Sequence, residues 1–93
     1  MKLIAELNEG GYSWSAVASF KDDGGRVFYA MESGCSCNSS SWNPWQETTQ
    51  PDDPLPLTKD NAQKFIDDVT AHMRDEATPE QIRDFIAQTY AAL

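Results

Sequence analysis

The last third of the chain carries two amphipathic helix patterns, and these constrain the fold more than any other feature. In the first pattern, apolar residues recur at the three- and four-residue spacing of one helix face; they are Ala62, Phe65, Ile66, Val69 and Met73. In the second pattern, the same spacing is made by Ile82, Phe85, Ile86, Thr89 and Tyr90. Each apolar stripe must be buried against another layer of protein. The sequence therefore predicts two helices that cover a third element.

Both helices carry signals for where they begin. Thr58 is expected to cap the first helix with its hydroxyl group. The second helix is expected to begin at Thr78-Pro79-Glu80-Gln81, which supplies a capping hydroxyl, a proline at the first helical position and the glutamine of a capping box. Residues 74–78 are left as a short connection. Residues 58–93 should therefore form an antiparallel helix hairpin.

Residues 1–32 predict an antiparallel meander of strands joined by short, glycine-containing turns. Apolar and polar residues alternate in the first two strands, and the third is almost continuously apolar. The predicted strands are residues 2–7, 13–20 and 27–31. In the second strand, we expect the face that carries Trp14 to be buried and the face that carries the serines to meet solvent.

Residues 33–57 break this pattern, because they are rich in serine, asparagine, proline and acidic residues. Both cysteines and two of the three tryptophans lie within residues 34–45. A short edge strand near residues 45–48 would be bounded closely by Pro44 and Pro51. Long connections of this kind in a compact domain are usually functional or mobile.

The economical arrangement buries one face of the sheet against both helix stripes. We therefore expect a single α+β domain over residues 1–93, with an antiparallel three- to four-stranded β-meander packed on a C-terminal antiparallel helix hairpin. Its parts would be the meander (1–32), the Cys/Ser/Trp/Pro-rich loop (33–57) and the helical hairpin (58–93).

The charge balance narrows the classes of partner. Fifteen acidic residues against seven basic ones give a net charge of −8, which would repel a nucleic acid. An acidic surface could instead occupy a basic patch on a protein that normally binds nucleic acid, or it could simply keep the domain soluble. No apolar run approaches the roughly 18–20 residues of a membrane span, and the first residues do not form a signal peptide. We expect no membrane partner and a cytoplasmic location.

The two cysteines leave three readings open. A structural zinc site needs four ligands, whereas the chain offers Cys35, Cys37 and His72 at unsuitable spacing. A disulfide between Cys35 and Cys37 would close a small, strained ring, and no basic residue lies beside either thiol in the sequence. The third reading is that both thiols are small buried side chains. We predict no metal and no cofactor, and keep a metal- or redox-linked site as an alternative.

The sequence offers no catalytic constellation. Ser39–Ser41 have no histidine in their sequence context, and Asp67-Asp68 is expected to be a solvated helix face. His72 lies on the flank of an apolar stripe and is expected to be a packing residue with a satisfied ring nitrogen. We therefore predict that the protein is not an enzyme.

The tryptophan-containing loop is the predicted interaction surface. Exposed tryptophans on a loop are typical of the anchors that dominate protein–protein interfaces. The predicted partner-binding residues are Cys35, Ser36, Cys37, Asn38, Trp42 and Trp45. The predicted role is a non-enzymatic protein–protein interaction module, and a homodimer is left open.

One motif resembles a known group of proteins. Gly34-Cys35-Ser36-Cys37-Asn38-Ser39 follows strands that contain Trp14 and Phe28-Tyr29, and this arrangement resembles small uncharacterised proteins of actinobacterial phages. In that family a G-C-S-C segment is followed by Trp or Pro-Trp. The resemblance covers about residues 3–50, although the serines and Asn43 before the second tryptophan depart from the tighter form. It implies a phage accessory protein that acts on a host or phage protein in the host cytoplasm.

Overall fold

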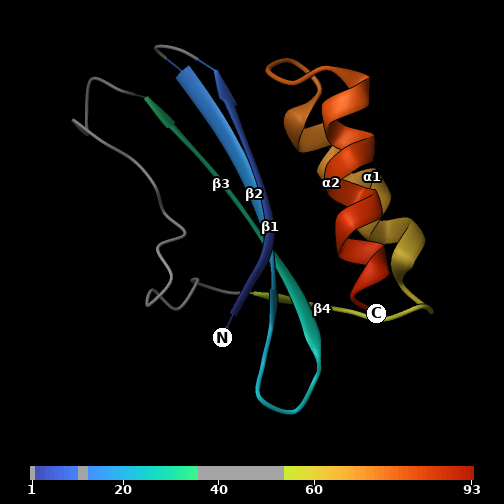
Figure 1. The fold of residues 1–93 in the computed structure, drawn as a ribbon. Helices are drawn as coiled ribbons and strands as arrows, with labels where there is room; N and C mark the ends of the chain where they lie inside the picture. The colour runs from blue at the N-terminus through green and yellow to red at the C-terminus, as the bar shows by residue number, and fades with distance from the viewer. Residues whose placement is uncertain (1, 11–12, 36–53) are drawn as a thin grey trace.

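The computed structural model describes residues 2–10, 13–35 and 54–93. Its elements are β1 (Lys2–Gly10), β2 (Ser13–Lys21), β3 (Val27–Cys35), β4 (Leu55–Leu57), α1 (Ala62–Met73) and α2 (Pro79–Ala91). The strands form a four-stranded antiparallel sheet in the order β1-β2-β3-β4, and both helices lie on the same side of it (Figure 1). The predicted α+β class, a meander packed on a C-terminal helix hairpin, is confirmed.

The fourth strand of the described sheet, β4, was not predicted from the sequence. The possible edge strand near residues 45–48 lies outside the described residues and stays a prediction. β4 pairs antiparallel with β3 at one edge of the described sheet. Pro56 stands opposite Phe28 in this pairing. A proline has no N–H to donate, so it is tolerated in a strand at the edge of the sheet. At its C-terminal end, β3 continues to Cys35, beyond residue 32, where the meander was predicted to end.

β2 is buried on both faces, which corrects the prediction of a solvent-facing serine side. Every residue from Ser15 to Phe20 is buried, and Ser19 has no exposed surface. Val17, between the serines, belongs to the core cluster that the helices complete. The serine face is dry because the helices lie on it, and small side chains leave room for their approach.

β1 carries a bulge that breaks its predicted alternation. The pairing with β2 shifts between Leu3 and Ala5, so Ile4 is an extra residue. Leu3 packs with Trp14 and the buried residues on the sheet face away from the helices. Ile4, Ala5 and Leu7 belong to the core on the helix side.

α2 begins as the sequence predicts. The Thr78 hydroxyl accepts a hydrogen bond from the backbone N–H of Gln81 at 3.1 Å. The Gln81 side-chain oxygen accepts one from the backbone N–H of Thr78 at 2.8 Å. These reciprocal bonds make a complete capping box, with Pro79 at the first helical position.

α1 begins differently, and the prediction that Thr58 caps it is wrong. The helix starts at Ala62, with Asn61 at the N-cap position and no side-chain capping bond. The Asn61 amide instead accepts from the backbone N–H of Thr58 at 2.7 Å and donates to the carbonyl of Pro56 at 2.8 Å. Its side chain stabilises the turn from β4 into the helix and is therefore not available to cap.

The core between helices and sheet is built on aromatic contacts. The rings of Tyr29 and Phe65 meet edge to face with centroids 4.9 Å apart, and those of Phe65 and Phe85 are 6.2 Å apart. The α2 stripe is buried as predicted at Ile82, Phe85 and Thr89. Tyr90, however, is 41% exposed, because its neighbour Thr89 takes the inward position against β2.

Candidate functional site: a groove between the two helices

The predicted loop surface is not tested by the structure. Ser36, Cys37, Asn38, Trp42 and Trp45 lie outside the described residues. Cys35 is the last residue of β3, and the structure describes its backbone but not its side chain. The interaction surface nominated from the sequence thus stays a prediction.

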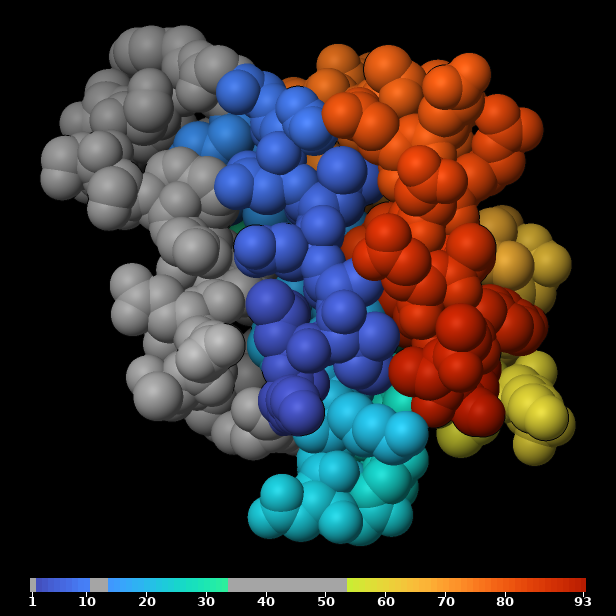
Figure 2. Space-filling model, in the orientation of Figure 1, coloured from blue at the N-terminus to red at the C-terminus, as the bar shows by residue number. Residues whose placement is uncertain are grey.

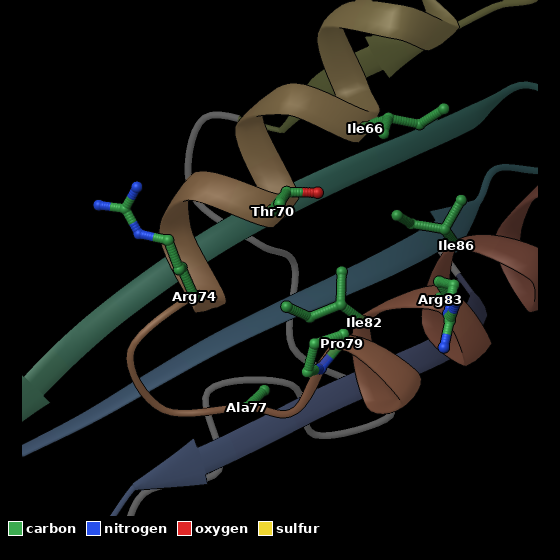
Figure 3. A pocket seen from close by; sticks show the side chains of 8 residues that line it. All are labelled: Ile66, Thr70, Arg74, Ala77, Pro79, Ile82, Arg83 and Ile86. Carbon is green, nitrogen blue, oxygen red and sulfur yellow. The ribbon is translucent and has the colours of Figure 1, made fainter.

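The described part of the chain contains a different surface, a groove between α1 and α2 that we call the helix groove (Figure 3). Its volume is about 250 Å³. One wall is a stripe of α1, the other is the facing side of α2, and the connection between the helices closes one end, with the strands behind. The lining residues are Ile66, Thr70, Arg74, Ala77, Pro79, Ile82, Arg83 and Ile86.

The floor of the helix groove is apolar and continuous with the core. Ala77 and Ile82 are buried, whereas Ile66 and Ile86 are half-buried and pack against the core from its margin. The two helices do not close over these isoleucines. Part of each side chain therefore stays in contact with water, where a partner could cover it.

The rim of the groove is cationic. Arg74 and Arg83 are both exposed, one on each helix. Arg74 lies 3.9 Å from the Asp75 carboxylate, with both side chains more than 70% exposed (75% and 84%), so this pair contributes little. Among the described residues, Arg83 takes part in no ion pair. Two arginines thus flank the groove, with the Arg74 guanidinium directed outward (Figure 3), on a chain whose net charge is −8.

Polar contacts hold α1 onto the sheet. The Tyr29 hydroxyl donates to Asp68 Oδ2 at 2.9 Å, and Lys64 Nζ donates to the same oxygen at 2.7 Å. The Lys64 hydrogen bond, followed by that of Tyr29, holds the pKa of Asp68 below its ordinary 3.8. Burial, followed by the Asp68 contact, raises the pKa of Tyr29 above 10.0.

A histidine makes a second bond between α1 and the sheet. His72 Nε2 lies 2.8 Å from the backbone carbonyl of Glu32. A carbonyl can only accept, so Nε2 carries the proton in this contact. This agrees with the expectation of a packing histidine whose ring nitrogen is satisfied.

α2 is held by a buried pair of hydroxyls. Ser19 Oγ and Thr89 Oγ1 lie 2.7 Å apart, and the Thr89 hydroxyl donates to the carbonyl of Phe85 at 2.9 Å. Because Thr89 has one proton and gives it to that carbonyl, Ser19 must be the donor to Thr89. Gln81 also donates to the Glu9 carboxylate at 2.8 Å. Both walls of the helix groove are therefore fixed before any partner arrives.

Sequence reasoning missed two features of this site. Asp68 was expected to be simply solvated, yet it bonds to Tyr29 across the layers. Ile66, Thr70 and Arg74 repeat at four-residue spacing, which places them on one helix stripe beside the buried one. That spacing is visible in the sequence, but the opening between the helices depends on how they pack.

A second hollow lies where β3 and β4 meet the β2–β3 turn. Its volume is about 540 Å³, and its lining includes residues 25–28, 56–59 and Leu93. The guanidinium of Arg26, one of two cationic groups in its lining beside Lys59, is already engaged. Arg26 Nε donates to Asp22 Oδ2 at 2.9 Å, and the guanidinium carbon lies 5.9 Å from the centre of the Phe28 ring.

The described residues contain neither a metal-ligand cluster nor a membrane-spanning helix. Within residues 2–10, 13–35 and 54–93, no three His, Cys, Asp or Glu side chains gather in a way that could hold a metal ion. In the same ranges, no helix has the length and apolar character needed to cross a membrane.

Comparison with known proteins places the chain in a family. The profile of a domain of unknown function, DUF7574, matches residues 1–92. The chain belongs to this family. No curated protein and no solved structure matches the chain. The family description names no activity, so the role of this DUF7574 protein must be argued from its geometry.

Proposed function

We propose that this DUF7574 protein is a non-enzymatic protein-binding module and that the helix groove is its binding surface. The observation that carries the proposal is the pair of core isoleucines, Ile66 and Ile86, left partly open between two arginines. Pockets for small molecules usually have volumes of ~300–1,000 Å³. The helix groove, at about 250 Å³, suits one or two side chains of a protein partner better.

The occupant we propose is an amphipathic helical segment with an aliphatic anchor and an acidic residue beside it. A helix that lies along a groove presents its apolar residues every three or four positions. An aliphatic side chain would cover Ile66 and Ile86, and a carboxylate on either side would meet Arg74 or Arg83. Either arginine could donate two parallel hydrogen bonds to such a carboxylate.

Contacts within the groove are not sufficient for binding by themselves. Covering the open parts of two isoleucines contributes about 1–3 kcal/mol. Association itself costs several times more in lost freedom of motion, so contacts beyond the groove are needed. We expect dissociation constants of roughly micromolar order, about −8 kcal/mol, for a short peptide.

The resemblance to phage proteins adds a setting to this proposal, in which the partner is a host or phage protein in the host cytoplasm. The alternative is an acidic decoy that occupies the basic surface of a nucleic-acid-binding protein. The two differ in their salt dependence. Binding in the helix groove is mostly apolar and should respond weakly to salt, whereas binding of a decoy should weaken steeply.

The test begins with a displayed library of peptides of about 15 residues, selected on the folded protein. Selected peptides are then added to protein with labelled isoleucine methyl groups, and the NMR shifts are mapped. We expect aliphatic and acidic residues in the peptides, and shifts at Ile66, Ile82 and Ile86. Thr70→Trp, which fills the groove, should weaken binding about tenfold or more. Ala71→Trp, exposed on the same helix but outside the groove lining, is the matched control.

Three results would contradict the proposal. The first is equal affinity of the Thr70→Trp and Ala71→Trp proteins for the selected peptides. The second is selection of lysine-rich peptides alone, without any aliphatic and acidic peptides, and with binding that is lost in salt; this would favour the decoy. The third is loss of binding only when Trp42 and Trp45 are changed to alanine, which would return the interaction to the sequence-predicted loop.

A further inference from the structure

β1 is an edge strand of the four-stranded sheet, and within residues 2–10, 13–35 and 54–93 no strand pairs with its outer side. Its first residues carry two features that discourage additional pairing, namely Lys2 and the bulge at Ile4. From Ala5 to Gly10, however, the register with β2 is unbroken. Alternate residues of this six-residue stretch direct their N–H and C=O groups away from β2.

This stretch lies at the surface beside α2. Figure 2 shows β1 and α2 next to one another on the face toward the viewer. Between them is a hollow of about 190 Å³. Its lining residues are Glu6, Leu7, Gln81, Asp84, Phe85 and Gln88. A strand laid along β1 would therefore place alternate side chains against α2, with room for one of them in the hollow.

The charge around this edge is negative. Glu6 and Asp84 are exposed, and among the described residues neither takes part in an ion pair. Glu9 lies on the same strand and accepts a hydrogen bond from Gln81. The nearest base on β1 is Lys2, on the other side of the bulge.

We propose that the Ala5–Gly10 edge accepts an extended, basic segment of another protein as an additional strand. Backbone hydrogen bonds along the edge would supply affinity without regard to sequence. Lysine or arginine at alternate positions would lie on one face of the added strand, where they would meet Glu6 and Asp84, which line the same hollow. This charge complementarity supplies selectivity. This surface is separate from the helix groove, so the two proposals stand or fall independently.

A second copy of the chain fits this edge less well. Joining two β1 edges would bring Glu6, Glu9 and Asp84 of both copies to one seam. Like charges that face each other across a strand pair destabilise the pairing. The same charges favour a basic strand, so the edge itself discriminates between the two occupants.

The probe is a soluble peptide of about ten residues that alternates lysine with valine. Two further peptides serve as references: one with glutamate in place of lysine, and one with proline in place of valine, which cannot form a ladder. Affinity is measured by NMR titration, and hydrogen exchange is followed at the amides of Ala5–Gly10. We expect the lysine–valine peptide alone to bind and to slow exchange at the outward amides of this stretch.

Charge reversal localises the site. Glu6→Lys combined with Asp84→Lys should weaken binding of the lysine–valine peptide about tenfold or more. Asp23→Lys combined with Asp60→Lys changes the net charge equally at exposed positions away from β1, and should change affinity less than about twofold. Thr70→Trp should have no effect, which separates this edge from the helix groove.

Any of three outcomes would overturn the inference. One is equal weakening by both double variants, which would mean attraction to net charge only. Another is binding without slower exchange at Ala5–Gly10. The last is protection of these amides by self-association of the peptide-free protein, which would make a second copy the occupant.

Discussion

The two sides of the helix pair differ in how completely they are closed. On the inner side, Phe65 and Phe85 are buried and the polar groups of Ser19 and Thr89 bond to each other. On the outer side, Ile66 and Ile86 are half-buried, and the arginines at the rim make at most weak ion pairs. The inner side can therefore supply stability, whereas the outer side leaves apolar surface and charge for a partner. One face of a helix pair can thus stabilise the fold while the other face stays available for binding.

The largest effect is expected from truncating two neighbouring residues of α2, of which Phe85 is buried in the core and Ile86 lines the helix groove. Phe85→Ala should destabilise the fold by ~3–5 kcal/mol, because it leaves a cavity between the sheet and both helices. Ile86→Ala, at the groove, should cost only about 1 kcal/mol, because its side chain is already partly in water. Chemical denaturation of both variants measures the difference. Similar losses would mean that the two faces are not distinct.

A smaller effect is expected at the buried hydroxyl pair. Thr89→Val leaves the Ser19 proton without its acceptor and should cost ~1–3 kcal/mol. Ser19→Ala should cost less, about 0.5–1.5 kcal/mol, because Thr89 still donates to the carbonyl of Phe85. The double variant should lose less than the sum of the two. Equal and additive losses, measured by urea denaturation, would show that the direction of this hydrogen bond is wrong.

The smallest effect is expected from acid. The pKa of Asp68 is lower in the folded protein than its ordinary 3.8, so the folded state binds this proton less readily than the unfolded chain. The stabilisation is present above about pH 4 and is lost as the pH falls through the folded pKa. Because the carboxylate is partly exposed, it should amount to less than ~1 kcal/mol.

Asp68→Asn provides the measurement. Melting temperatures at about pH 7 and about pH 3 should differ less for this variant than for the original protein. The difference should shrink without vanishing, because a hydrogen bond from the backbone N–H of Arg26 also lowers the pKa of the Asp22 carboxylate. An unchanged difference would mean that Asp68 does not tie α1 to the sheet, and the inner side would then owe its rigidity to packing alone.

Most of the fold could be predicted because its signals are local. The capping box at Thr78 and Gln81 and the stripe that contains Phe85 depend on spacing along one helix, and both are confirmed. The predictions failed where contacts between residues far apart in the sequence determine the local structure. Thr58 does not cap α1 because Asn61 binds back to β4, and Ser19 is dry because Thr89 of α2 covers it.

The candidate site was less accessible to sequence reasoning than the fold. Ile66 and Ile86 were correctly placed on apolar stripes, yet spacing alone does not reveal that the helices leave both of them partly open. The edge of β1 likewise depends on the order of strands in the sheet. The sequence-predicted loop, by contrast, stays a prediction, because its tryptophans lie outside the described residues.

The side-chain amide of Asn61 links the edge strand β4 to the beginning of α1. Through Asn61, the carbonyl of Pro56 in β4 and the backbone N–H of Thr58 share a single side chain just before α1. If β4 separates from β3, that side chain still ties the strand to the start of α1, so movement of one displaces the other. Opening at this corner should therefore be cooperative, with strand and helix end released as one unit.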